Sequence, residues 1–192
     1  MAGRPRDLEL EQRLLAAAWS LLVDKGYEAL SLSQVAAQAG AHRSDVYRRW
    51  STKAQLVSDT LTEHLPAVSA FDTGALSSDL EAYVADLAEA WSSPWVDGLV
   101  GWLADLREDS DAATAFDAMA KGRGRNLGNA IERAVERGEI TAVSGEDLHL
   151  LAELLEGPLM HRRLLSRIPL TEDHLAAVAA TAHGWLTRTA SP

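Results

Sequence analysis

Residues 31–50 have the sequence SLSQVAAQAGAHRSDVYRRW, which is the pattern of two short helices joined by a tight turn. Ser31 can cap the first helix, and Gln34, three residues later, can return the hydrogen bond as in a capping box. Gly40 suits the turn because glycine enters the left-handed backbone region without a Cβ penalty. Ala36 is small enough to let the two helices touch. The stretch therefore predicts a helix-turn-helix.

The second helix of such a motif lies in the major groove of DNA and offers its first residues to base edges. Those residues are His42, Arg43, Ser44 and Asp45. Arg43 suits a guanine edge, and Ser44 suits either a base or a phosphate. Asp45 would repel phosphate, but its carboxylate can accept a hydrogen bond from the amino group of cytosine. Alternatively, Asp45 binds only the neighbouring Arg48 or Arg49.

Further residues of this segment are spaced to reach the phosphates that flank the groove. They are Tyr47, Arg48 and Lys53, and the helix starts near Ser31 and Thr52 would add backbone N–H donors. Trp50 is expected to fill the core between two helices rather than to stack on a base. The residues predicted to contact DNA are therefore Ser31, His42, Arg43, Ser44, Asp45, Tyr47, Arg48 and Lys53.

Charge is distributed unevenly along the 192 residues, whose net charge is −10. Residues 1–60 carry eight basic and seven acidic side chains (net +1), and the remainder carries ten and 21 (net −11). Only the first segment suits a polyanion, and the acidic remainder would confine contact with DNA to that segment. Arg4 and Arg6 form either a basic arm for a minor groove or a disordered segment with weak electrostatic attraction.

Composition excludes several classes of protein. Hydrophobic residues make up 47% of the chain, as in ordinary globular proteins, and the absence of cysteine excludes disulfides and thiolate metal sites. The first residues lack the apolar core of a signal peptide, and no apolar run approaches the length of a membrane span, so we expect a cytoplasmic protein without a membrane partner. Residues 121–128 contain Gly-x-Gly without the third glycine or a preceding strand. No histidine pair has metal-binding spacing, so we expect no enzyme, cofactor or metal site.

Apolar spacing of three and four residues runs through the whole chain and predicts an all-α fold. Four N-terminal helices end before Pro66, and five more are expected at about 78–92, 95–107, 111–137, 145–166 and 171–188. Pro158 should kink the fourth of these five, because proline lacks the backbone donor. The loop-like residues 66–78 place a boundary between a DNA-binding head at 8–66 and a C-terminal helical domain at 67–192.

Residues 10–60 resemble the DNA-binding domain of the tetracycline-repressor (TetR) family of bacterial transcription regulators. The resemblance is carried by Gly26-Tyr27, Ser31, Val35-Ala36, Ala39-Gly40, Val46-Tyr47-Arg48-Arg49-Trp50, Ser51-Thr52-Lys53 and Leu56. It implies a homodimer whose three-helix heads bind a palindromic operator. It also implies that the C-terminal domain holds a pocket for a small-molecule inducer and the dimer interface.

If that plan holds, two sets of residues in the C-terminal domain acquire roles. The predicted pocket residues are Trp91, Trp95, Trp102, Phe116 and Met119, and ordinary core packing is the alternative for each. The predicted dimer-interface residues are Leu151, Leu155, Leu159, Val178, Ala182 and Trp185, in two helices that would form a four-helix bundle with their copies.

The sequence thus predicts a DNA-binding transcriptional regulator, a repressor that leaves a pseudo-palindromic operator when it binds an inducer. It would be associated with the nucleoid when bound to DNA. Ala41-His42 and Ser44-Asp45 stand where the family usually has Val-Ser and Gly-Thr. These departures motivate one alternative, a helical ligand-binding or adaptor protein whose helix-turn-helix no longer binds DNA.

Overall fold

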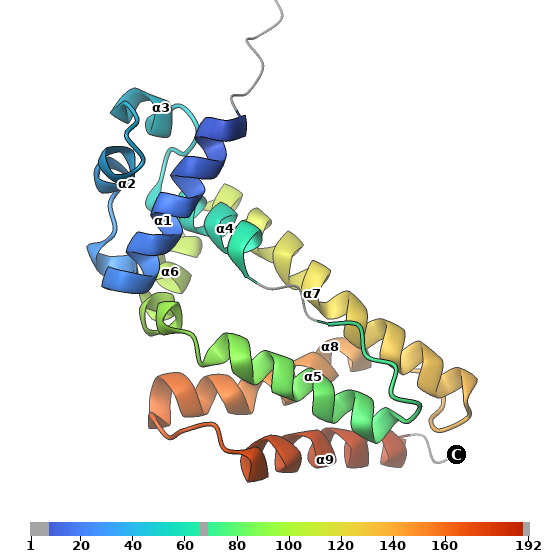
Figure 1. The fold of residues 1–192 in the computed structure, drawn as a ribbon. Coiled ribbons are helices and arrows are strands. Elements are labelled where there is room, and N and C mark those ends of the chain that lie inside the picture. The colour runs from blue at the N-terminus through green and yellow to red at the C-terminus, as the bar shows by residue number, and fades with distance from the viewer. Residues whose placement is uncertain (1–7, 66–68, 190–192) are drawn as a thin grey trace, which may run out of the picture. The chain divides into compact units, whose positions relative to one another are not determined.

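The structure is a computed structural model that describes residues 8–65 and 69–189, and every regular element in those ranges is a helix (Figure 1). The prediction of an all-α fold is confirmed. The first helices are α1 (Leu8–Ala29), α2 (Leu32–Gln38), α3 (Arg43–Tyr47), α4 (Lys53–His64) and α5 (Leu76–Trp91). They are followed by the 3₁₀ segment η1 (Pro94–Gly98), α6 (Leu99–Leu106), α7 (Ser110–Glu136), α8 (Gly145–Met160), the π-helical segment η2 (His161–Ser166) and α9 (Glu172–Thr189). Arg4 and Arg6 lie outside the described residues.

Packing divides the chain into two compact units. The first contains the described residues of Met1–Leu65 together with Pro94–Met119, and the second contains those of Pro66–Ser93 and Ala120–Pro192. The segment η1–α6 and the first turns of α7, which were predicted to belong to the C-terminal domain, therefore pack in the same unit as the helix-turn-helix. The physical reason is that Leu99, Trp102 and Leu106 of α6 are buried.

The core of the first unit forms where α1 packs against α4, η1 and α6. Gly26 has a φ of +77°, which breaks the regular helix and precedes the buried ring of Tyr27. A Cβ at Gly98 would lie only 2.6 Å from the backbone nitrogen of Tyr27, so the close approach of η1 to α1 requires glycine. The helix-turn-helix joins this core through α2, which packs against both α1 and α3.

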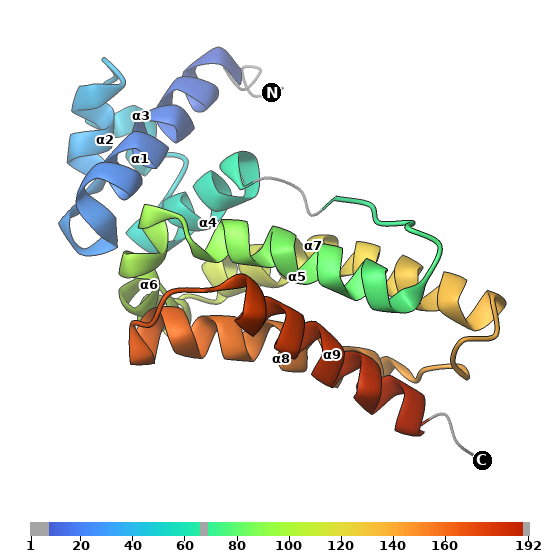
Figure 2. The same cartoon turned by 60° about the horizontal axis from the view of Figure 1, so that its bottom comes forward.

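The second unit is built around α5, which packs against α8 and α9 (Figure 2). Its buried apolar side chains come from all three helices and include Leu80, Leu87, Leu151, Leu155 and Val178. The α-helical geometry of α8 ends at Met160, two residues after Pro158, and changes there to the π-helical turn of η2. Arg167 follows in the left-handed conformation with a φ of +55°.

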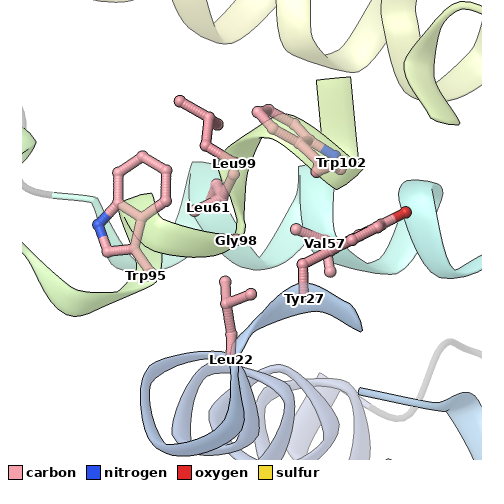
Figure 3. A pocket seen from close by; sticks show the side chains of 8 residues that line it. All are labelled: Leu22, Tyr27, Val57, Leu61, Trp95, Gly98, Leu99 and Trp102. Atoms are coloured by element: carbon pink, nitrogen blue, oxygen red, sulfur yellow. The ribbon is translucent and has the colours of Figure 1, made fainter. Parts of the chain in front are cut away.

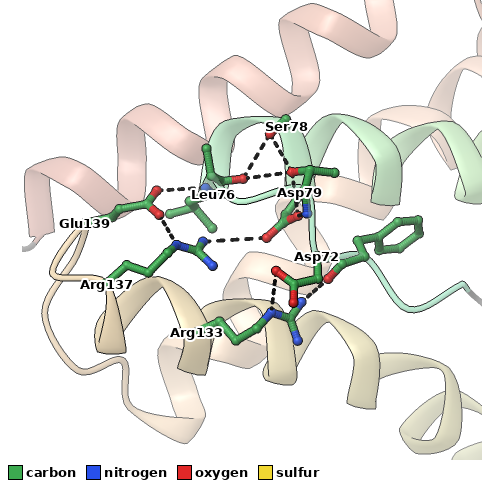
Figure 4. Close-up of polar contacts among 10 residues, drawn as sticks. Asp72, Leu76, Ser78, Asp79, Arg133, Arg137 and Glu139 are labelled. Carbon is green, nitrogen blue, oxygen red and sulfur yellow. Dashed lines mark hydrogen bonds and ion pairs between the residues drawn. The ribbon is translucent and has the colours of Figure 1, made fainter.

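A polar network joins α5 to the end of α7 in the second unit (Figure 4). Asp79 is buried, and its Oδ1 accepts hydrogen bonds from the backbone nitrogen and hydroxyl of Thr73 at 2.8 and 2.7 Å. The Arg137 guanidinium lies 3.7 Å from the other oxygen of Asp79 and also donates to Glu139. Glu139 in turn accepts from the Leu76 backbone nitrogen at 2.7 Å.

Burial in the single chain argues against three of the predicted dimer-interface residues. Leu151, Leu155 and Leu159 are 0% exposed, Val178 and Ala182 are also buried, and Trp185 is half-buried, all within a single chain. A side chain with no exposed surface has none to lose to a second copy, so the three leucines belong to the core of the second unit. Leu150 and Met160 are the large apolar side chains of α8 that remain exposed.

In the part of the chain that the structure describes, no helix is both long enough and apolar enough to cross a membrane.

Candidate nucleic-acid interface

The helix-turn-helix begins at the capping box that the sequence predicted. The Gln34 backbone nitrogen donates to Ser31 Oγ at 3.3 Å, and the Ser31 backbone nitrogen donates to Gln34 Oε1 at 3.0 Å. This reciprocal pair satisfies two backbone donors that a helix start leaves free, and such a cap contributes about 1 kcal/mol. α2 is therefore a stable support although it has only seven residues.

The turn between α2 and α3 directs the start of α3 outward. Gly40 has a φ of +62°, and the Ala41 backbone nitrogen donates to the Ala36 carbonyl at 2.9 Å, which closes the turn. Val35, Ala36 and Val46 are buried where the two helices meet. Because these small and branched side chains hold the inner faces together, the side chains at the start of α3 are left on the surface.

Most of the predicted DNA-contacting residues lie exposed along this surface. His42, Arg43, Ser44 and Tyr47 are exposed, Asp45 is half-buried, and Ser31 is exposed at the start of α2. His42 is the N-cap of α3 but its side chain makes no capping hydrogen bond, as its replacement of the family's serine suggested. Tyr47 is 52% exposed, an unusual position for a large aromatic side chain that only packs a core.

The four cations between residues 31 and 53 differ in their surroundings. Arg48 Nη2 lies 2.8 Å from Asp45 Oδ1, in an ion pair on the surface of α3. Arg49 is mostly buried, donates to the Asp45 carbonyl at 2.9 Å and lies 3.7 Å from Glu11 of α1. Arg43 is exposed and makes no ion pair with the described residues, so it is the cation most available to a base.

Lys53 is held by its own chain, although the sequence predicted a contact with phosphate. Its Nζ donates to the Tyr27 carbonyl at 3.2 Å and lies 3.9 Å from the centre of the Tyr27 ring. The Tyr27 hydroxyl donates to Asp105 of α6 at 2.5 Å. Burial, and then this carboxylate, raise the pKa of the Tyr27 hydroxyl. Three donor hydrogens on the ammonium leave Lys53 able to bind a phosphate from this position.

A second set of contacts fixes the start of α4 directly after the motif. Thr52 caps α4 by accepting from the Gln55 backbone nitrogen at 3.1 Å, and its hydroxyl donates to Asp109. The Gln55 side chain donates to Asp109 at 3.2 Å. The Thr52 hydroxyl and then further donors hold the pKa of the Asp109 carboxyl below its usual value. Trp50 is buried, as expected, and its Nε1 donates to Asp59 at 2.8 Å.

The supporting roles of Tyr27, Asp105 and Asp109 were not predicted from the sequence. Their partners are 26 to 78 residues away along the chain, so helical spacing gives no signal for them. Tyr27 alone was marked by the pair Gly26-Tyr27 that contributes to the resemblance.

The predicted pocket residues do not all belong to one unit. Trp95 and Trp102 lie in the first unit with Leu22, Val57 and Leu99, where the side chains leave no space that would hold a water molecule (Figure 3). Trp102 also packs edge-on against Phe116, with ring centres 5.2 Å apart. Met119 ends the first unit, and Trp91 lies in the second. The indole N–H groups of Trp95 and Trp102 are buried without an acceptor among the described residues.

Comparison with known families matches the two parts of the chain separately. Residues 14–60 match the family described as bacterial regulatory proteins, tetR family, and residues 70–182 match the family described as tetracyclin repressor-like, C-terminal domain. The interval between the two matches, residues 61–69, includes the boundary between 66 and 67 that the sequence predicted.

Curated relatives carry corresponding names. The chain is 34% identical over 158 residues to the DNA-binding transcriptional repressor TetR of Mycobacteroides abscessus, covering 79% of this chain and 80% of that protein. It is 27% identical to the uncharacterized HTH-type transcriptional regulator YdeS of Bacillus subtilis, covering 85% and 83% of the two chains.

Solved structures share the fold. The crystal structure of the TetR family transcription regulator SCO0332 superimposes with a TM-score of 0.71 at 24% identity, covering 92% of this chain and 97% of that one. The multidrug binding protein EbrR, crystallised with proflavin, gives a TM-score of 0.62 at 19% identity, covering 90% and 99%.

Proposed function

The chain belongs to the TetR family of bacterial DNA-binding transcriptional regulators, and we propose that it is a repressor that leaves its operator when it binds a small-molecule inducer. Family membership makes it a regulator rather than an enzyme. We assign a DNA-binding domain to residues 8–66 and a ligand-binding and dimerisation domain to residues 67–192, and the family matches at 14–60 and 70–182 support this assignment.

The observation that carries DNA binding is the exposed start of α3 on a capped and tightly packed support. Arg43 is free to donate to a guanine edge, and Ser44 lies beside it. Tyr47, Arg48 and Lys53 then contact flanking phosphates, while the capped start of α2 at Ser31 presents backbone donors. His42 completes the contacts from the N-cap position of α3.

Repression requires two heads on one operator. A homodimer would place its recognition helices about 34–36 Å apart, one turn of DNA, so that the operator is a pseudo-palindrome. The exposed Leu150 and Met160 of α8 support an interface on this helix, because they are large apolar side chains without cover in one chain. The half-buried Trp185 of α9 is a further candidate.

The inducer would act by favouring one arrangement of the dimer. A ligand that binds better to a dimer whose heads no longer match successive grooves shifts the population away from DNA. The unpaired indole N–H groups of Trp95 and Trp102 support a ligand that carries hydrogen-bond acceptors, and Phe116 offers an aromatic face beside them. Since no space for water exists there, such a ligand has to displace side chains. Met119, at the end of the same unit, remains a candidate contact of this ligand, whereas Trp91 belongs to the second unit and would contact only a ligand bound there.

Footprinting of the DNA upstream of the chain's own gene tests this proposal. We expect a protected pseudo-palindrome with half-site centres about 10–10.5 base pairs apart, occupied by two chains. A panel of aromatic compounds that carry hydrogen-bond acceptors should contain one that abolishes protection and binds the free protein. Protection that no compound relieves would contradict inducer release. Ligand binding without protection of any DNA would contradict repression and favour a ligand-binding protein with an inactive motif.

A further inference from the structure

We infer that Asp45 is a specificity-determining residue that recognises cytosine in each operator half-site. The ion pair with Arg48 reduces the repulsion between this carboxylate and the DNA phosphates. The inference rests on the proposed function, because it needs α3 to lie in the major groove. It concerns a single acidic side chain among the exposed and basic residues of that helix.

The position of Asp45 is suited to a base contact. It is the third residue of α3, following Arg43 and Ser44, and the first residues of a recognition helix are those that meet base edges. Its side chain is 21% exposed, so it is accessible from the DNA side while the backbone behind it is packed. The Arg49 side chain fixes that backbone by donating to the Asp45 carbonyl at 2.9 Å.

The two oxygens of the Asp45 carboxylate differ in their hydrogen bonds. Oδ1 accepts from Arg48 Nη2 at 2.8 Å, whereas Oδ2 accepts no hydrogen bond from the residues that the structure describes. An ionised carboxylate has only acceptors, so it can bind only a donor on a base edge. The major groove presents two kinds of donor, the N4 amino group of cytosine and the N6 amino group of adenine.

Cytosine is the better partner of these two bases. The adenine amino group stands between its own N7 acceptor and the O4 acceptor of the paired thymine, whereas the cytosine amino group has an acceptor, O6 of the paired guanine, on one side only. Guanine and thymine offer acceptors where the carboxylate needs a donor. A cytosine opposite Oδ2 is therefore favoured, adenine provides a donor only between two repelling acceptors, and guanine and thymine leave the carboxylate without a donor.

Arg48 explains why an acidic residue can stand at this place. An isolated carboxylate would be repelled by the phosphates on both sides of the groove, but the ion pair with Arg48 cancels its charge. The Arg48 side chain is 65% exposed, and it keeps further N–H donors for a phosphate while it holds Asp45. Asp45 thus selects a base, while Arg48 supplies affinity for any sequence.

Selection from a randomised duplex pool tests the inference with the full-length chain and four variants. Wild-type sites should carry cytosine at one fixed position of each half-site, and replacing it in one half-site should weaken binding about ten-fold or more. Asp45→Asn should select adenine there, because an amide pairs with both N6 and N7. Asp45→Ala should accept every base there, with affinities within about three-fold of one another. Only such a small difference between bases should remain once the single selective contact is lost.

Two controls separate base recognition from general charge. Glu63→Gln removes the same charge from an exposed position on α4, and it should select the wild-type sites. Arg48→Ala should keep the cytosine while its affinity for all sequences falls. Sites without a fixed cytosine, or an Asp45→Ala variant that still selects it, would overturn the inference while leaving the regulator intact. A wild-type chain that selects no sequence would instead overturn the proposed function.

Discussion

The arginines of the α2–α3 surface and those of the α5–α7 network have opposite surroundings. Arg43 and Arg48 are exposed, and the only ion pair between them and the described residues joins neighbours three positions apart. Arg133 and Arg137 instead bind residues about 60 positions away, among them the buried Asp79. Exposed cations with local partners can exchange them for a phosphate or a base at little cost. Cations tied to distant segments hold the fold together.

This difference separates the effects of substitution. Loss of an exposed cation should change DNA affinity and leave the free energy of unfolding unchanged, since exposed ion pairs contribute about 0–1 kcal/mol. Loss of a buried partner should lower the free energy of unfolding and leave DNA affinity unchanged, because a desolvated polar group is left without its hydrogen bonds.

The largest effect is expected for Asp79→Ala, which should lower the free energy of unfolding by about 2–3 kcal/mol. The change removes both hydrogen bonds to Thr73 and the carboxylate facing Arg137. Urea titration followed by circular dichroism measures the loss. Glu81→Ala, at an exposed position of the same helix, is the matched control and should change it by less than about 0.5 kcal/mol. Equal effects of the two substitutions would contradict the stabilising role of the buried Asp79 network.

Arg43→Ala should leave the unfolding midpoint unchanged and reduce discrimination between bases by about 1–3 kcal/mol at one position of each half-site. The reason is that the exposed guanidinium has no ion pair with the described residues to lose on the surface of the free protein. Anisotropy titrations with the selected duplex and its single-base variants measure the discrimination. A variant that keeps the full ratio between operator and random DNA would show that another residue contacts the base.

Lys53→Ala tests both kinds of contact at once, because Lys53 is a candidate phosphate contact and is also bound to the distant Tyr27. If it contacts phosphate, its loss weakens binding to all sequences about equally and lowers the magnitude of the salt slope by about one. Its contacts with the carbonyl and ring of Tyr27 predict in addition a small loss of stability, about 0.5–1 kcal/mol. Tyr47→Phe should weaken binding without the second effect. Unchanged affinity in Lys53→Ala would make Lys53 a structural residue only.

The smallest effect is expected on the pH dependence of stability. A hydrogen bond from the Leu76 backbone nitrogen, and then Arg137, hold the pKa of the Glu139 carboxyl below its unfolded value. Because the folded state binds this proton less readily, the stabilisation is present at neutral pH and is lost as pH falls through the lowered pKa. Glu139→Gln should therefore flatten the dependence of the unfolding midpoint on pH below about 4.5, the ordinary range of a glutamate carboxyl. A variant with the wild-type dependence would contradict this.

Local signals explain which features the sequence could predict. The capping box at Ser31, the turn at Gly40 and the exposed start of α3 depend on residues within about ten positions, and the structure has all three. The helices α5 to α9 lie close to the five ranges that apolar spacing predicted, because each buries one face.

Features that depend on distant partners could not be predicted. Apolar spacing identified Leu151, Leu155 and Leu159 as one stripe, but it does not tell whether a stripe is covered by the same chain or by a second copy. The attachment of Lys53 to Tyr27 and the packing of α6 with the head have the same cause. In both cases the deciding neighbour lies far along the sequence.

The central claim is that residues 31–53 bind DNA with sequence preference. Its most direct test is the affinity of the wild-type chain for its best selected duplex and for a scrambled duplex, measured by anisotropy at several salt concentrations. We predict that log K falls linearly with log salt, by about 0.9 for each phosphate contact, and that the selected duplex binds at least about 10³-fold more tightly at physiological salt. Equal affinity for both duplexes at every salt concentration would contradict the claim.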